Sequence, residues 1–256
     1  MDVDVLFDPF GGRWSDLGRA AALAEESGFD GVWLYDHLAG SAHGADDVLE
    51  CWTVLTAIAA TVPRIAVGPL VLNVANRSAG TLAVMAATLQ EVSGGRLLLG
   101  MGAGGSRRTP YAAEQEALGR SVGGSLTRRT QLEEHIGAVR QAWTGTVGDV
   151  SGFLRPEPPP PIIIGGFGPK MAELAGRLGD GINVPAGPNL DQLIDLARTA
   201  HARSGRDPTA FIVTVSANTS APARERLLEL GVDRHIVSIG APYVGGVRRA
   251  AEALHR

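Results

Sequence analysis

The sequence predicts a single TIM (β/α)8 barrel, which is an α/β fold, and three observations support this prediction. Eight short apolar segments alternate with eight segments of helical periodicity along the whole chain. Such alternation indicates parallel strands joined by right-handed helical crossovers. The length of 256 residues matches a barrel of about 250 residues. A doubly wound open sheet is the alternative, but few such sheets take eight parallel strands from so short a chain.

Composition and charge narrow the class of protein. Hydrophobic residues make up 45% of the chain, which is enough for one large core. The net charge of −4 gives no basic surface of the kind that binds nucleic acid or an anionic membrane. A single cysteine, Cys51, excludes an internal disulfide and a cysteine-based metal cluster. The first residues, M-D-V-D-V-L-F-D-P, carry acidic residues where a signal peptide would carry positive charge, and no apolar run approaches about 18 residues. A cytoplasmic protein is therefore expected.

The first half of the chain supplies four strand–helix units. Strands are predicted from apolar runs at residues 3–7, 29–35, 65–72 and 96–101. Ser15 and Ser78 can cap the helices that follow the first and third strands, and a further helix is predicted over residues 48–59. Gly68 and Pro69 interrupt the third strand, and proline cannot donate a hydrogen bond to a neighbouring strand. We therefore expect a local distortion there.

The second half supplies the other four units. Its strands are predicted at residues 162–164, 180–184, 211–215 and 235–239. Helices are predicted from residues 127, 169, 190, 223 and about 247. Residues 106–126, rich in Arg, Gly and Ser, show no clear period and are predicted to be irregular. Because no linker or internal repeat divides the chain, residues 1–256 are expected to form one domain.

The stretch I-I-I-G-G-F-G-P-K joins an apolar strand to a helix and is a candidate anion-binding site. Gly165, Gly166 and Gly168 break the strand, and Pro169 suits the first turn of the helix. Free backbone N–H groups at such a helix start can hold a phosphate. Lys170, the only lysine of the chain, lies on the same first turn. The alternative is a tight strand-to-helix turn without a ligand.

Few charged residues follow the predicted strands, although active sites of TIM barrels are built at these carboxyl ends. The ends of the first five strands carry Asp8, Asp36 and His37, Asn73, and glycines within 102–105 and 165–168. They show no Ser-His-Asp spacing, no metal-like cluster and no catalytic carboxylate pair. A site of backbone and small side chains suits a flat cofactor that supplies its own reactivity.

Four motifs resemble those of the luciferase-like monooxygenase superfamily. A-E-E-S-G-F-D-G-V-W-L-Y-D-H (24–37) is similar to its second-strand signature, and V-S-G-G-R-L-L-L-G-M-G-A-G (92–104) to its fourth-strand signature. Residues 160–182 resemble its cofactor-phosphate segment, and G-R-D-P (205–208) resembles a frequent late motif. The resemblance covers nearly the whole chain in order. It implies a TIM barrel, in agreement with the strand count.

The resemblance implies an oxidoreductase that uses the deazaflavin coenzyme F420 or flavin mononucleotide (FMN). The first interpretation is hydride transfer between F420 and a small organic substrate. The second is oxygenation by reduced FMN, with a flavin or deazaflavin reductase as partner. The third is non-catalytic binding of flavin or deazaflavin, because a strong acid–base pair is missing from the sequence motifs. A homodimer is a further expectation.

The resemblance also implies the site residues. The cofactor ring would lie against the third strand, where a non-proline cis peptide bond is expected between Leu70 and Val71. His37, beside Asp36, corresponds to a histidine near the redox ring in deazaflavin enzymes, and these two are the predicted catalytic residues; the alternative is a histidine that only holds its loop. The predicted cofactor contacts are Leu70, Val71, Gly102, Gly104, Gly165, Gly166, Phe167, Gly168 and Lys170.

Three features leave the substrate open. Gly105 stands where the sugar-phosphate dehydrogenase branch carries a glutamate as acid catalyst, which argues against the same substrate chemistry. Arg107 and Arg108 either bind an anion or are solvated. The insertion between strands four and five, which usually covers the site, is shortened here, so a more open site is expected.

Overall fold

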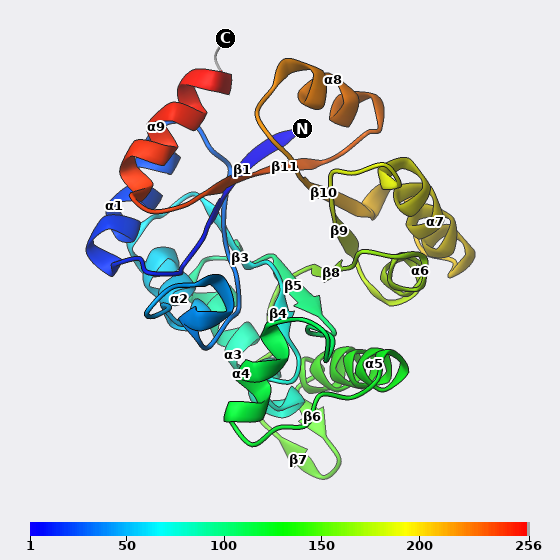
Figure 1. Ribbon diagram of the computed structural model, residues 1–256. Helices are drawn as coiled ribbons and strands as arrows, with labels where there is room; N and C mark the ends of the chain where they lie inside the picture. The colour runs from blue at the N-terminus through cyan, green and yellow to red at the C-terminus, as the bar shows by residue number, and fades with distance from the viewer. Residues whose placement is uncertain (255–256) are drawn as a thin grey trace.

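The computed structural model describes residues 1–254. These residues fold into a ring of parallel strands surrounded by helices (Figure 1). The ring runs in the order β3-β2-β1-β11-β10-β9-β8-β5-β4. Its strands are β1 (Asp2–Phe7), β2 (Gly31–Leu34), β3 (Ala66–Pro69), β4 (Leu72–Asn73), β5 (Leu99–Gly102), β8 (Ile162–Gly165), β9 (Gly181–Pro185), β10 (Ile212–Ser216) and β11 (Arg234–Ile239). Residues 255–256 of the predicted domain lie outside the described range.

The pairing of the first and last strands confirms the predicted barrel. β1 runs parallel to β11 from Asp2 opposite Arg234 to Phe7 opposite Ile239. The ring closes at β3, where the Val67 amide donates to the Arg96 carbonyl at 3.1 Å and the Val67 carbonyl accepts from the Leu98 amide at 2.9 Å. The carboxyl ends of all these strands therefore face the same end of the barrel.

The helices pack around the outside of the ring, and α1, near the start of the chain, lies beside α9, the last helix (Figure 1). They are α1 (Trp14–Glu26), α2 (Cys51–Thr61), α3 (Ala79–Val92), α5 (Ser125–Ala142), α6 (Pro169–Leu178), α7 (Leu190–Arg203), α8 (Ala221–Glu229) and α9 (Tyr243–Leu254). Short elements are η1 (Gly40–His43), α4 (Tyr111–Ala117), η2 (Pro208–Ala210) and the hairpin β6 (Thr146–Val147) and β7 (Val150–Ser151). Within residues 1–254, no helix is both long enough and apolar enough to cross a bilayer.

Two apolar clusters fill the fold. The larger lies between the strands and the surrounding helices. The smaller fills the barrel and includes Leu6, Trp33 and Ile163. Near the amino ends of the strands, buried Asp4 accepts hydrogen bonds from Trp33 Nε1 and Arg234 Nε, each at 2.7 Å. The interior is therefore a packed core, and space for a ligand is left only at its carboxyl end.

Two helix starts differ from the sequence prediction. Ser15 lies inside α1, which begins at Trp14 without a side-chain cap. α2 begins at Cys51 and not near residue 48, because the Glu50 carboxylate accepts the first free N–H groups of the helix. The cap predicted for α3 is confirmed, since Ser78 Oγ accepts from a backbone N–H at 3.3 Å.

The third predicted strand is divided into β3 and β4, which confirms the expected distortion. β3 pairs with β2, and β4 pairs with β5. The residues between them, Leu70 and Val71, are joined by a non-proline cis peptide bond, as the family resemblance implied.

The prediction of irregular structure over residues 106–126 is wrong for α4. This seven-residue helix is too short to show a period, and side-chain contacts hold it in place. Gln115 Nε2 donates to Asn76 Oδ1 at 2.7 Å, which ties α4 to the loop after β4. The segment between β5 and β8 therefore brings a helix to the carboxyl end of the barrel.

Candidate active site

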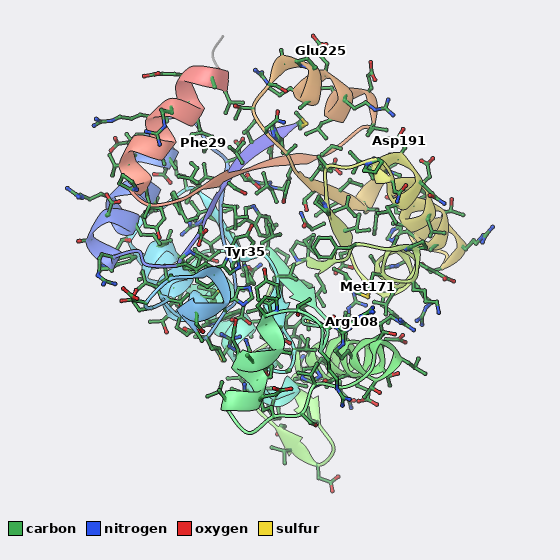
Figure 2. The ribbon with its side chains drawn as sticks, in the orientation of Figure 1. Phe29, Tyr35, Arg108, Met171, Asp191 and Glu225 are labelled. Atoms are coloured by element: carbon green, nitrogen blue, oxygen red, sulfur yellow. The ribbon has the colours of Figure 1, made fainter. Side chains whose placement is uncertain are left out.

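A cavity of about 650 Å³ lies at the carboxyl ends of the strands, within the range of about 300–1,000 Å³ typical of small-molecule sites. Tyr35, on its wall, lies inside the ring of helices, whereas Asp191 and Glu225 lie on the outside (Figure 2). The cavity brings together the predicted residues Asp36, His37, Leu70, Val71, Gly102, Gly104, Gly165, Gly166, Phe167 and Gly168. Lys170 does not line it, and its side chain is exposed on α6. Its predicted contact with a cofactor therefore has no support in the cavity wall.

The middle of the cavity wall is built around Val71. A Cβ atom on Gly102 would lie 2.5 Å from Val71 Cγ2, and one on Gly165 would lie 2.8 Å from the same atom. No side chain fits at those distances. These two glycines are thus required by packing, whatever ligand the cavity takes. The Val71 side chain therefore packs directly against both glycines in the cavity wall.

One end of the cavity is the start of α6, which we call the donor end. Gly168 is the N-cap and makes no side-chain cap hydrogen bond. Within residues 1–254, the N–H groups of Phe167 and Gly168 have no hydrogen-bond acceptor. A Cβ atom on Gly168 would meet nothing within 4 Å, so the space before the helix is open. Free N–H groups at a helix start attract an anion.

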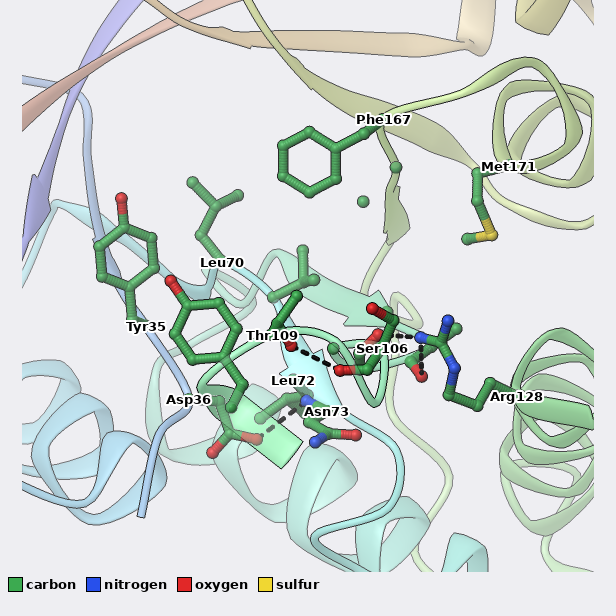
Figure 3. Close-up of a pocket in the computed structure, with 18 of the residues that line it drawn as sticks. Tyr35, Asp36, Leu70, Leu72, Asn73, Ser106, Thr109, Arg128, Phe167 and Met171 are labelled. Carbon is green, nitrogen blue, oxygen red and sulfur yellow. Dashed lines mark hydrogen bonds between the residues drawn. The ribbon is translucent and has the colours of Figure 1, made fainter. Parts of the chain in front are cut away.

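Two arginines that the sequence analysis missed line the cavity from α5, Arg128 and Arg129. Arg128 donates to the carbonyl oxygen of Gly104. Its Nε atom is buried and finds no acceptor among the described residues. In Figure 3, Arg128 lies on the same side of the cavity as Met171 of α6 and opposite Tyr35. The predicted alternatives, Arg107 and Arg108, are absent from the wall.

The opposite end, the aromatic end, surrounds His37 with rings. The His37 ring centroid lies 4.5 Å from that of Tyr111, 5.6 Å from that of His43 and 6.4 Å from that of Tyr35. Phe10 stacks on His43 at 4.0 Å. Burial raises the pKa of Tyr35 above its usual value, so its hydroxyl stays protonated at neutral pH. This end is therefore lined mainly by rings, several of which carry polar atoms.

A buried carboxylate on α4 meets His37. Glu114 Oε1 lies 2.7 Å from His37 Nδ1, and Oε2 accepts from the Leu38 N–H at 2.9 Å. The Glu114 side chain is only 4% exposed. His37 Nε2 has no hydrogen-bond partner within the part of the chain that the structure describes. A histidine held at one nitrogen and free at the other is arranged for proton transfer.

Asp36 is fully engaged by the loop after β4. Its Oδ2 accepts from the Asn73 N–H, from Asn76 Nδ2 and from Arg77 Nη1, at 2.9, 3.0 and 2.9 Å. Burial lowers the pKa of Arg77, but its bonds to Asp36 outweigh that effect and raise it overall. These contacts anchor the loop beside His37. The catalytic role predicted for Asp36 stays a prediction.

Residues 6–255 match the sequence model of a protein family described as luciferase-like monooxygenase. The chain is a member of the luciferase-like monooxygenase family. An F420-dependent glucose-6-phosphate dehydrogenase of Nakamurella multipartita is 32% identical over 207 residues, which are 75% of this chain and 59% of that protein. A 5,10-methylenetetrahydromethanopterin reductase of Methanolobus tindarius is 34% identical over 203 residues, 75% of this chain and 57% of that protein. The luciferase-like chain thus spans less than two thirds of the length of these relatives.

Solved structures show the same fold as this luciferase-like chain. An F420-dependent secondary alcohol dehydrogenase with an F420-acetone adduct has a TM-score of 0.82 at 18% identity, covering 99% of both chains. The coenzyme F420-dependent tetrahydromethanopterin reductase of Methanopyrus kandleri has a TM-score of 0.74 at 17% identity, covering 100% of this chain and 97% of that one. At this identity the likeness establishes the barrel architecture.

Gly105 is closely packed in the wall of this luciferase-like site. A Cβ atom there would lie 2.8 Å from Thr109 Oγ1 and 3.0 Å from Tyr111 Cβ. A glutamate does not fit at residue 105 unless the segment that carries α4 moves. Besides Asp36, the cavity wall holds a second carboxylate, which comes from Glu114 on α4.

Proposed function

We propose that this luciferase-like protein binds F420 in the cavity and transfers hydride between it and a small, uncharged organic substrate. The observation that carries the proposal is the presence, in one cavity, of a donor end and an aromatic end, with Val71 and its neighbouring glycines in the same wall. A bound deazaflavin would supply the hydride chemistry. The chain supplies binding, orientation and proton transfer.

The donor end fits the phosphate of such a cofactor. The free N–H groups of Phe167 and Gly168 and the open space before α6 form a cradle for an anion. The unpaired Nε of Arg128 and the neighbouring Arg129 add positive charge to the same side. Leu70 and Val71 would support the ring, as the family resemblance implies.

His37 is the residue that we propose moves the substrate's proton. It lies on the cavity wall, and its Nδ1 is already bound to Glu114. Positioned acid–base groups contribute about 10²- to 10⁴-fold to rate. The presence of this histidine–carboxylate pair favours an enzyme over a non-catalytic binding protein.

The charge around His37 supports an uncharged substrate. Arg128 and Arg129 are the only arginine or lysine residues among the described cavity residues; both come from α5, and Arg128 lies opposite Tyr35 (Figure 3). The Glu114 carboxylate lies at the aromatic end, where it would repel a phosphate or carboxylate on the substrate. We therefore propose a secondary alcohol or ketone in place of a sugar phosphate.

Titration of the purified protein with F420 and with FMN tests the cofactor, because the ring of each changes its absorbance or fluorescence on binding. We expect tighter binding of F420 and reduction of F420 by neutral secondary alcohols. Binding of FMN alone would favour the reduced-FMN monooxygenase instead. Binding of F420 without turnover of any alcohol, ketone or sugar phosphate would favour the non-catalytic alternative.

A further inference from the structure

We infer that Glu114 is the positioning residue for His37: its carboxylate holds Nδ1–H, so that Nε2 is the ring nitrogen that exchanges a proton with the substrate. This inference rests on the proposed function, since His37 has a substrate proton to move only if hydride transfer occurs in the cavity. It assigns a chemical role to α4, a helix that lies outside the family motifs of the sequence.

The hydrogen bonds of Glu114 determine which nitrogen carries the proton. An ionised carboxylate only accepts hydrogen bonds. Oε2 already accepts from the Leu38 N–H at 2.9 Å, and Oε1 lies 2.7 Å from His37 Nδ1. Nδ1 must therefore carry a hydrogen, and the neutral ring keeps its lone pair on Nε2.

The surroundings of Glu114 fix its position. Its side chain is 4% exposed, against 19% for His37, so the histidine is the member of the pair nearer to the cavity opening. The next residue, Gln115, ties α4 to Asn76 with a 2.7 Å hydrogen bond. Tyr111, one turn earlier on α4, packs against the His37 ring at 4.5 Å. One short helix thus supplies both the acceptor and the packing surface for the imidazole.

The proton and electron balance follows from this arrangement. When an alcohol is oxidised, the carbinol C–H bond breaks and its electron pair leaves as hydride, for which a bound oxidised deazaflavin would be the acceptor. The hydroxyl proton passes to His37 Nε2, and the carbon–oxygen double bond forms. The ring is then an imidazolium, and the Glu114 carboxylate at Nδ1 stabilises its charge. Reduction of a ketone takes the same proton from Nε2–H in reverse.

The substitution Glu114→Gln tests this role because it keeps the shape and changes the donor pattern. If the glutamine oxygen accepts from the Leu38 N–H, its NH₂ group donates to Nδ1, and the neutral ring carries its proton on Nε2 instead. The ¹⁵N NMR signals of the imidazole report the tautomer directly, with His37→Ala used to assign them. Glu116→Gln, at an exposed position of the same helix, is the matched control.

We expect Nδ1–H in the parent and in Glu116→Gln, and Nε2–H in Glu114→Gln. Turnover of Glu114→Gln should fall by about 10²-fold or more with little change in KM, since a misplaced proton disables the base. The same tautomer in the parent and in Glu114→Gln would overturn the inference, as would unchanged turnover. The NMR measurement needs no cofactor, so it tests the tautomer of His37 whether or not F420 binds. Failure of F420 to bind would refute the proposed function alone.

Discussion

The two ends of the cavity differ in what they offer a ligand. The donor end presents backbone N–H groups of Phe167 and Gly168, whose positions follow from the path of the chain. The aromatic end presents the side chains of His37 and Glu114, whose function depends on their identity and protonation. Substitutions at the two ends should therefore change different quantities. The donor end should control cofactor affinity, and the aromatic end should control turnover.

The largest effect is expected from His37→Ala. Loss of a positioned acid–base group should lower kcat by about 10²- to 10⁴-fold. The dissociation constant for F420 should change little, because the proposed phosphate site is at the other end. Steady-state kinetics and a binding titration on the same variant check both statements. A loss of affinity without a loss of turnover would reverse the roles of the two ends.

The next effect is expected from Gly168→Asp at the donor end. Residue 168 has an extended backbone and open space for a side chain, so Asp can cap α6 without strain. Its charge would repel a bound phosphate and compete with it for the helix start. The interaction of a charge with a helix start is worth up to about 2 kcal/mol in partly buried sites. Gly168 is a better position for this substitution than Gly166, where a Cβ atom would clash with Met171.

Gly168→Asn is the matched control, since it has nearly the same shape and no charge. We expect F420 to bind the Asp variant about 10-fold more weakly than the Asn variant, a difference of about 1.4 kcal/mol. Fluorescence titration at fixed salt measures both constants. Equal affinities would remove the phosphate from the start of α6.

A comparable or smaller loss of affinity is expected from Arg128→Met. The side chain lines the cavity, and its Nε has no acceptor among the described residues. A hydrogen bond to a charged group contributes about 1.5–3 kcal/mol, part of which Arg129 would replace. Arg108→Met is the control, because Arg108 does not line the cavity. If Arg128→Met binds F420 as the parent and the control do, Arg128 has no part in binding.

The smallest effect concerns the loop behind the aromatic end, where Glu50 pairs with Arg77 and caps α2. Burial raises the pKa of Glu50, but bonds to the Thr53 and Trp52 N–H groups outweigh it and leave the pKa below its ordinary value of 4.5. Its contribution to stability is therefore present above pH 4.5 and is lost as the pH falls through the lowered pKa. The difference in free energy of unfolding between Glu50→Gln and the parent should become smaller in acid, as measured by urea unfolding at several pH values. A difference that stays constant with pH would show that the carboxylate charge is not involved.

The sequence predicted the parts of the site that adjoin strand ends. Gly165 to Gly168 and His37 follow apolar runs directly, so the alternation of strands and helices was enough to place them at one end of a barrel. A local distortion of the third strand was foreseen because Pro69 has no N–H to donate to a neighbouring strand.

The missed residues lie on helices whose positions depend on tertiary contacts. Glu114 belongs to a short helix without a period, although the run Y-A-A-E-Q-E-A holds good helix formers that could have indicated it. Arg128 reaches the cavity because α5, which packs mainly on α3, begins beside the carboxyl end of the barrel. Lys170 is adjacent to the glycine turn in sequence, but its side chain is exposed and absent from the cavity wall. Adjacency in sequence places a backbone and does not fix where a side chain points.

A crystal structure of the protein with F420 tests the central claim most directly. The account predicts phosphate oxygens within about 3.2 Å of the Phe167 or Gly168 amide nitrogen. It also predicts the deazaflavin ring beside Leu70 and Val71, with its reacting face open toward His37. A phosphate bound at the His37 end, or a ring bound outside the cavity, would contradict the assignment of the two ends.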